Sequence, residues 1–455
     1  MAETSAPTTA QTNDLVYALD DTPAFTESTF AAIQHVLASF VGIITPTLVI
    51  GGVLGLGSHI PYLISMSLIV SGVATFIQAR RTLGVGAGML CVQGTSFAFL
   101  GSVLAAGFIA KGKGGGPDEI LSLIFTICFF GAFVEIFLSQ FIGKLKNVVT
   151  PLVTGIVITL IGLSLIKVGM TDLAGGFKAK DLGSPQNLML GGTVLFIVIF
   201  MNSMKNQWLR ISSIAIGLIV GFIIAWFMGK VNFDNLAGLP LISIPMPFKY
   251  GFSFDMTAFI PIAIIYVITA IETTGDITAN CVISGQEIEG EKYRNRVKGG
   301  VLADGINSMI AATFNTFPNT TFSQNNGVIQ LTGIASRHVG YYIAAILIIL
   351  GLFPVVGGVI QNMPKPVLGG ATLVMFAMVA AAGVRILKRV PMTRRSMLII
   401  AVSFGLGLGV MMVPEVTAQL PKLAKNLFSS PITTGGLAAI ILNLILPRNN
   451  TATLN

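Results

Sequence analysis

Apolar residues lie in about fourteen segments along the chain, and short polar connections separate them. Most segments approach the roughly 20 residues that a helix needs to cross a bilayer. Two of them, 89–110 and 318–335, are too polar or too rich in glycine for ordinary membrane helices. The pattern predicts an all-α polytopic membrane protein with segments near 30–51, 60–78, 89–110, 120–142, 150–169, 187–203, 210–229, 256–279, 299–316, 318–335, 339–360, 364–384, 396–413 and 431–446.

One polar stretch interrupts the tenth segment. Residues 317–333 read FPNTTFSQNNGVIQLTG, with a proline near the start and a run of amides and hydroxyls after it. Upstream, the carboxylates of Glu272, Asp276 and Asp304 lie in otherwise apolar sequence. A helix-breaking polar segment at membrane depth is tolerated only where it is buried in protein or lines a cavity. The stretch therefore indicates a transport site.

Composition supports a membrane protein and argues against other classes. The chain is 53% hydrophobic and 10% charged, with a mean hydropathy of +0.83, whereas soluble domains carry roughly a quarter charged residues. The net charge of +8 comes from Lys and Arg in short connections, so we predict no nucleic-acid partner. Nucleotide-binding and hydrolase motifs are absent, and neither the three histidines nor the three cysteines have metal-site spacing. We therefore predict no enzyme activity, no metal and no cofactor.

Charge also predicts an orientation in the membrane. Basic residues gather in connections after even-numbered segments, as at Arg80, Lys144, Lys292 and Arg389, and are sparser after odd-numbered ones. The positive-inside rule then places both termini in the cytoplasm. Residues 1–28 are polar and acidic with no Lys or Arg, which predicts a cytoplasmic tail rather than a secretory signal.

The two halves of the chain resemble each other weakly. Segments 150–169 and 365–384 both begin near a proline and continue as glycine-containing apolar helices, and they lie seven segments apart. The polar stretches 91–99 and 322–330 occupy matching positions as well. Because seven is odd, the second copy must be inserted upside down. Inverted repeats with two interrupted segments indicate a midplane binding site in secondary transporters, although apolar helices can also look alike without being related.

Several polar residues are candidates for that site. Glu272 and Asp276 lie four apart, so one helix places both on one face. Buried ionisable groups in a membrane mark a substrate or ion path by default, and two neighbouring carboxylates disfavour simultaneous ionisation, which suits a proton carrier. The alternative is a helix that ends near residue 272 and leaves both acids at the surface.

Asp304 and the adjacent amides Gln324 and Asn325 have two interpretations each. Asp304 is either a second proton-relaying group or an interfacial acid paired with the basic residues of 292–298. The two amides offer acceptors and donors that suit a planar heterocycle with alternating N–H and C=O groups, or they serve as turn and capping residues. With Glu272 in the same half of the chain, we favour ligand binding.

Two further ionisable residues lie in apolar segments. His35, in the first segment, either relays a proton or forms a hydrogen bond between helices, and the second role is favoured. Glu135 lies about two and a half turns before Lys144, so we expect it near the membrane interface rather than in a functional site.

The motifs together resemble a known family. The sequence QNNGVIQLTG at 324–333 resembles the signature of nucleobase–ascorbate transporters, and its paired Asn325 and Asn326 are similar to those of bacterial xanthine permeases. The similarity continues through IETTGDITA at 271–279, GGVLADG at 299–305 and QGTSF at 93–97. It covers nearly the whole chain from about residue 20.

The resemblance implies a proton symporter with fourteen transmembrane segments in two inverted seven-segment repeats. Short strands in segments 3 and 10 would meet at the substrate site. A core domain would comprise residues 29–142 and 251–362 (segments 1–4 and 8–11), and a gate domain 143–250 and 363–447 (segments 5–7 and 12–14). Polar cytoplasmic tails, 1–28 and 448–455, would flank them. A homodimer in the bacterial inner membrane would follow.

The resemblance also assigns roles to residues. Glu272 would accept hydrogen bonds from purine N–H groups, Gln324 would pair with another ring edge, and Asn325 would border the pocket. Phe97 would stack near the base, and backbone N–H groups around Ser96 and Phe97 would meet its carbonyls. Asp276, Asp304 and His35 match positions associated with proton coupling or with the shape and affinity of the site.

The predicted function is uptake of a purine nucleobase, xanthine first, with a proton as coupling ion. Some xanthine permeases carry Asn where this chain has Ser96, and the smaller hydroxyl leaves room for the extra oxygen of urate. Urate, alone or beside xanthine, is therefore an alternative substrate. A uracil permease and an anion exchanger of the same architecture are further alternatives.

Overall fold

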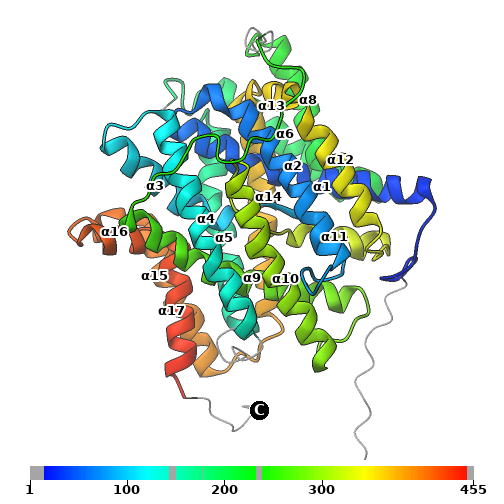
Figure 1. Ribbon diagram of the computed structural model, residues 1–455. Coiled ribbons are helices and arrows are strands. Elements are labelled where there is room, and N and C mark those ends of the chain that lie inside the picture. The colour runs from blue at the N-terminus through cyan, green and yellow to red at the C-terminus, as the bar shows by residue number, and fades with distance from the viewer. Residues whose placement is uncertain (1–14, 143–149, 178, 232–237, 448–455) are drawn as a thin grey trace, which may run out of the picture.

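The computed structural model describes residues 15–142, 150–177, 179–231 and 238–447 (Figure 1). The predicted tails are only partly covered, since 1–14 and 448–455 lie outside the described residues. So do Lys144 and Lys146, two of the basic residues used for the orientation. The described chain forms α-helices α1 (Phe25–Leu54), α2 (Ile60–Arg80), α3 (Leu100–Gly112), α4 (Pro117–Phe141), α5 (Pro151–Leu173), α6 (Pro185–Ser203), α7 (Gln207–Ile211), α8 (Ser213–Phe227), α9 (Met256–Ile283), α10 (Gly290–Thr313), α11 (Ser323–Thr332), α12 (Val339–Leu352), α13 (Pro354–Gln361), α14 (Lys365–Leu387), α15 (Arg394–Met412), α16 (Lys422–Phe428) and α17 (Pro431–Ile445).

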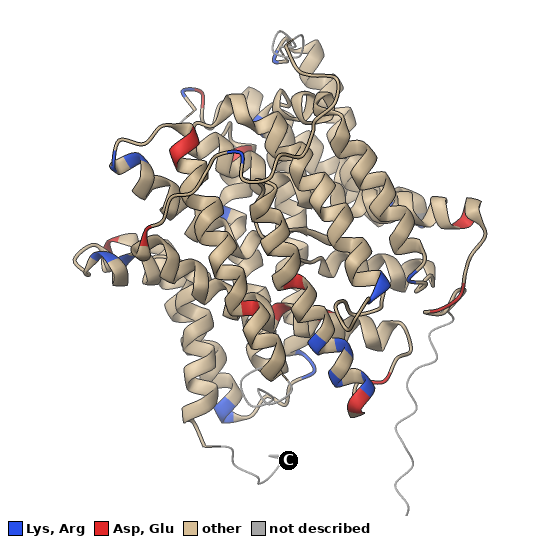
Figure 2. Cartoon of the chain, viewed as in Figure 1, with Lys and Arg blue, Asp and Glu red and all other residues tan. Residues whose placement is uncertain are grey.

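Many of these helices are long and apolar enough to cross a membrane. Eight of the described helices meet that test alone, and the count reaches ten when two bent helix pairs are each taken as one span. The pairs are α12–α13, bent by 74°, and α16–α17, bent by 85°. Figure 2 shows Lys and Arg mainly toward the ends of the helical body, with a few acidic residues inside it. The prediction of a polytopic, almost entirely helical membrane protein is confirmed.

Two short strands are the exception to the helical pattern. β1 (Gln93–Thr95) and β2 (Asn319–Thr321) pair antiparallel, with Gln93 opposite Thr321 and Thr95 opposite Asn319. Each strand leads into a helix, β1 into α3 through the 3₁₀ turn Phe97–Phe99 and β2 into α11. The expected short strands in the third and tenth segments, and their meeting, are therefore confirmed.

Helices α5 and α14 pack with their backbones in contact. A Cβ built on Gly162 of α5 would lie 2.2 Å from the backbone N of Ala380 in α14, and one on Gly383 of α14 would lie 2.4 Å from the backbone N of Thr159. The two backbones therefore touch where no side chain fits between them. These helices are the pair whose sequences, 150–169 and 365–384, look alike.

Local capping signals fix where key helices begin. Asp255 precedes α9, and its Oδ1 accepts hydrogen bonds from the backbone N–H groups of Thr257 (2.7 Å) and Ala258 (3.1 Å). Such a cap satisfies N–H groups that have no partner inside the helix. The start of α6 is fixed by a polar network.

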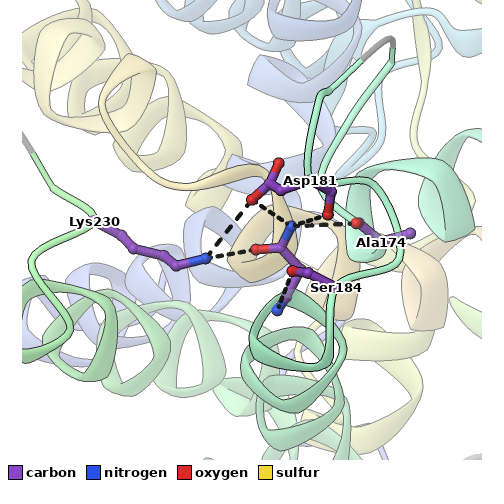
Figure 3. A network of polar contacts seen from close by, with 5 residues as sticks. Ala174, Asp181, Ser184 and Lys230 are labelled. Carbon is purple, nitrogen blue, oxygen red and sulfur yellow. Dashed lines mark hydrogen bonds and ion pairs between the residues drawn. The ribbon is translucent and has the colours of Figure 1, made fainter.

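That network joins the α5–α6 connection to the end of α8 (Figure 3). Asn187 donates from Nδ2 to Oδ2 of Asp181 (2.9 Å) and to its backbone O (3.0 Å), and accepts at Oδ1 from Nζ of Lys230 (2.7 Å). Ser184 Oγ accepts the backbone N–H of Asn187 (3.3 Å). These contacts hold the connection between α5 and α6 to the residues that follow α8.

Candidate functional site

The predicted acids of α9 share one face of a continuous helix. α9 runs through both Glu272 and Asp276 to Ile283, so the alternative of a helix ending near residue 272 is excluded. Glu272 is 9% exposed and Asp276 is 3% exposed, so neither lies at the surface. The structure thus places two carboxylates one turn apart inside the protein.

Asp276 holds the second strand and the helix after it. Its Oδ2 accepts a hydrogen bond from Thr321 Oγ1 (2.8 Å), and its Oδ1 accepts one from the hydroxyl of Ser323. Its backbone O accepts from Nδ2 of Asn326 (3.2 Å). Asp276 therefore attaches both β2 and the first turn of α11 to α9, and Asn280 adds a hydrogen bond from its Nδ2 to Oδ1 of Asn326 (2.9 Å).

Asp304 is tied to a different set of elements. It is fully buried on α10, and its Oδ1 accepts from Nε2 of Gln78 in α2 (2.9 Å). Its Oδ2 accepts from the Thr273 hydroxyl of α9 and, at 3.4 Å, from Thr320 Oγ1 of β2. The interfacial alternative, with Asp304 paired to Lys or Arg, is excluded because its partners are an amide and two hydroxyls.

Glu272 differs from its two neighbours. Its Oε2 is buried and has no hydrogen-bond partner within the described residues. Every ion pair that the structure describes lies elsewhere: His59–Asp118, Lys113–Asp255, Lys230–Asp181 and Arg337–Asp20. Glu272 is therefore the acid of this cluster with acceptor capacity left for a ligand.

The amides Gln324 and Asn325 open α11 beside α1. Asn325 Nδ2 lies 3.0 Å from Nδ1 of His35 and donates to the His35 backbone O (3.2 Å), whereas the buried Asn325 Oδ1 has no partner in the part of the chain that the structure describes. The favoured structural role of His35, a hydrogen bond between helices, agrees with this contact. Gln324 is partly buried, and a Cβ on Gly42 of α1 would lie 3.1 Å from its Nε2.

Ser96 and Phe97 follow β1 directly, and one of their backbone N–H groups already has a partner. The backbone N–H of Ser96 donates to Pro318 O (2.8 Å), so it is used in joining the strands and is not free for a ligand carbonyl. The buried Ser96 hydroxyl has no partner among the described residues. The Phe97 ring, 7% exposed, contacts Phe376 of α14 edge to face with 5.3 Å between centroids.

Phe322 is a site residue that the sequence analysis missed. A Cβ on Gly94 of β1 would lie 2.3 Å from its ring, and a Cβ on Gly42 of α1 would lie 2.8 Å from it. The ring is thus held between α1 and β1, next to Ser323 and Gln324. The sequence did carry a signal, Gly42 and Gly94, because a glycine in a membrane helix or a strand often marks a place where another group packs against the backbone.

Polar residues of α2, α9 and the strands were also overlooked. Gln78, Thr273, Thr320 and Thr321 bind the site carboxylates, and the buried Gln93 and Asn319 amides have no partner within the described residues. A hydroxyl or amide in an apolar segment is a weak signal alone, because such groups commonly bond to the backbone of their own helix.

The expectation for Glu135 is wrong. It lies on α4 with no exposed surface, not at the membrane interface. Both of its carboxylate oxygens are buried without a hydrogen-bond partner in the described residues. Its distance along the chain from Lys144 did not reveal which face of α4 it occupies.

Comparisons with known proteins match this arrangement. The sequence profile of the Permease family (Xan_ur_permease) matches residues 26–416. The xanthine permeases XanP and XanQ of Escherichia coli (strain K12) are each 46% identical to this chain, XanP over 442 residues and XanQ over 439. Each match covers 96% of this chain, and it covers 96% of XanP and 94% of XanQ. The xanthine permease of Bacillus subtilis (strain 168) is 35% identical over 419 residues, covering 91% of this chain and 92% of its own.

Solved structures support the fold class alone. The transmembrane domain of the cyanobacterial bicarbonate transporter BicA has a TM-score of 0.54 at 14% identity, covering 94% of this chain and 99% of its own. The structure of SLC26A9 has a TM-score of 0.58 at 14% identity, covering 90% of this chain and 65% of its own. The chain therefore has the helical membrane-transporter fold of these proteins.

Proposed function

The chain belongs to the nucleobase–ascorbate transporter family, the Permease family of its sequence profile, and we propose that it imports a purine nucleobase, xanthine first, together with a proton. The relatives named xanthine permeases match nearly their whole length, which supports xanthine as the substrate. The inward proton gradient would drive uptake, and no cofactor is needed.

The observation that carries this proposal is the unpartnered carboxylate of Glu272. Its buried Oε2 lacks a donor, whereas Asp276 and Asp304 are occupied by hydroxyl and amide donors. Purines display N–H groups along a planar edge, and a carboxylate that accepts them forms charge-assisted hydrogen bonds. The purine would supply the donor that Glu272 otherwise lacks.

The remaining site residues have matching roles in the proposal. Gln324 and the free Asn325 Oδ1 would bind other edges of the ring, with Asn325 oriented by His35. Phe97 would stack against the base. Asp276 and Asp304 would keep the strands in place and respond to the proton.

We further propose fourteen segments in two inverted repeats. Fourteen segments result when each of the following counts as one: the eight long helices, the two bent pairs, the two shorter apolar helices (Phe97–Gly112 and α8), α10, and β2 with α11. Segments 29–142 and 251–362 would form the core domain, and 143–250 and 363–447 the gate domain. Both termini would face the cytoplasm of a bacterium, in the inner membrane, and two gate domains would form the homodimer.

Substitution of Glu272 tests the function. The measurement is proton-driven uptake of labelled xanthine in cells without their own purine permeases, normalised to the protein in the membrane. Losing a hydrogen bond to a charged group costs about 1.5–3 kcal/mol, so E272Q should lower apparent affinity roughly 10- to 150-fold. E291Q, which changes an exposed Glu at the start of α10, is the matched control. Full uptake by E272Q would refute the mechanism, and counterflow of labelled xanthine separates a carrier from a channel.

Urate is the second candidate substrate, and the buried, unpartnered Ser96 hydroxyl favours it. Such a hydroxyl can donate to the additional oxygen on the five-membered ring of urate. A competition series of xanthine, urate, hypoxanthine, guanine and uracil measures the preference, and strong inhibition by uracil but not by xanthine would overturn the purine assignment. An anion exchanger is disfavoured because the site gathers acids rather than basic groups.

A further inference from the structure

Glu135 is a buried acid that the proposed purine site does not use. It lies on the inner face of α4, which also carries Cys128, Gly131, Ala132 and Ser139, all buried. These positions recur at the helical spacing of one face. The opposite face of α4 is exposed and apolar, with Phe130, Phe133 and Phe137.

α4 packs closely against both α9 and α10 near Glu135. A Cβ on Gly131 would lie 2.6 Å from the Tyr266 ring of α9, and one on Gly305 of α10 would lie 2.9 Å from the backbone N of Ile136. The Tyr266 hydroxyl donates to the backbone O of Cys128 (2.8 Å), which fixes α4 against α9. Glu135, which has no exposed surface, therefore lies in a packed interface of α4 with α9 and α10.

The groups that face Glu135 come from both neighbouring helices. From α9 these are Tyr266, the Thr269 hydroxyl and Glu272, and from α10 the facing group is Asp304. Thr269 donates to the backbone O of Tyr266 (3.2 Å). No cation is among these groups, so an ionised Glu135 would meet two further acids and no opposite charge.

An unpaired carboxylate in such a place is costly. An ionised carboxylate without a partner in an apolar interior is far less stable than the neutral acid. Acids inside membrane segments are accordingly rare, and by default they mark ion or proton paths. Within the described residues Glu135 makes no hydrogen bond to the strands, whereas Asp304 accepts hydrogen bonds from Thr273 of α9 and Thr320 of β2.

We propose that Glu135 is a proton-binding site of the transport cycle, distinct from the residues that contact the purine. This inference rests on the proposed function. A proton from water adds to the carboxylate to give the neutral acid, and the same proton leaves to the other side when the carboxylate reforms. Asp304 connects the site to β2, because it faces Glu135 and accepts a hydrogen bond from Thr320 (3.4 Å).

Two assays separate this role from purine binding. Counterflow exchanges labelled for unlabelled xanthine and needs no net proton movement, whereas accumulation in proteoliposomes under an imposed pH difference does. One pH unit supports about tenfold accumulation when one proton moves per purine. E135Q should keep counterflow near the wild-type rate and lose accumulation, and its uptake should become insensitive to external pH. E135D, which restores a carboxyl, should recover accumulation with a shifted pH profile.

Control variants define the other outcomes. S139A changes a buried hydroxyl on the same face of α4, and it should behave as wild type in both assays. Wild-type accumulation and pH profile in E135Q would overturn the proposal, as would parallel loss of counterflow and accumulation that E135D does not restore. If E135Q does not reach the membrane, E135M, which has a side chain of similar volume, is assayed instead. Absence of both variants from the membrane would show that Glu135 is needed for folding, and this result would also overturn the proposal. No xanthine counterflow by the wild type would refute the proposed function instead.

Discussion

The close contact of α5 and α14 gives a prediction that can be worked from distances. A Cβ on Gly162 would lie 2.2 Å from the backbone N of Ala380 and 2.6 Å from its Cα. Both atoms belong to the α14 backbone, so no side-chain rotation relieves the overlap. To reach the 3.4 Å of an ordinary contact, the helices must separate by about 1.2 Å at this point.

The energetic cost follows from that separation. Adding one methyl group to a packed core costs typically about 1–3 kcal/mol when the backbone has to shift. Alanine is otherwise favoured over glycine in a helix by up to about 1 kcal/mol, so G162A combines a steric loss with a smaller gain. We expect a net destabilisation near 1–2 kcal/mol and an apparent Tm a few degrees lower.

The assay is thermal unfolding of purified protein in one detergent, with xanthine uptake in cells as a second readout. G405A is the matched control, because Gly405 is also helical but has no atom within 4 Å of a built Cβ. It should be neutral or slightly stabilising. If G162A unfolds at the same temperature as wild type or G405A, the two helices are not in backbone contact, and the explanation given for their packing fails.

Two further predictions concern Asp255 at the start of α9 and Ser96 after β1. The Lys113 ammonium, 2.5 Å away, and the Thr257 hydroxyl lower the pKa of Asp255 to about 2 in the folded protein. The ionised Asp255 therefore stabilises the fold fully above the pKa of about 3.8 that it has in the unfolded chain, and this stabilisation is lost as the pH falls toward 2. D255N should therefore lower Tm at pH 7, and the difference from wild type should shrink on acidification in scans at several pH values; a constant difference would contradict the ion pair. S96N should weaken urate inhibition more than xanthine uptake, and equal loss of both would mean that Ser96 does not border that edge.

The interrupted segments were predictable because their signal is local. Proline, glycine and adjacent amides break an apolar pattern wherever they occur, so 91–99 and 317–333 stand out without knowledge of the fold. The spacing of Glu272 and Asp276 likewise fixes their shared helix face. The pairing of β1 with β2 is not local, and the resemblance to a family rather than any spacing predicted it.

Other features depended on contacts between distant segments. The Ser96 N–H is used by Pro318, a partner more than two hundred residues away, and no property of QGTSF reveals this. Glu135 was placed by its distance to Lys144, although burial depends on the side of α4 that it occupies. The small residues Gly131 and Ala132, one turn earlier, mark that side as the packed one.

The hydrogen-bond pattern divides the buried acids of α4, α9 and α10 into two kinds. Asp276 and Asp304 each accept hydrogen bonds from β2, so their bonds depend on where the strand lies. Glu272 and Glu135 have carboxylate oxygens without hydrogen-bond partners among the described residues. If a purine binds at Glu272 and a proton at Glu135, any factor by which the purine raises the affinity for the proton equals the factor by which the proton raises the affinity for the purine. β2, which bonds to Asp304 through Thr320, is the element that would carry this effect between the two sites. A substitution that removes this bond should therefore weaken proton-driven accumulation of xanthine more than it weakens xanthine binding.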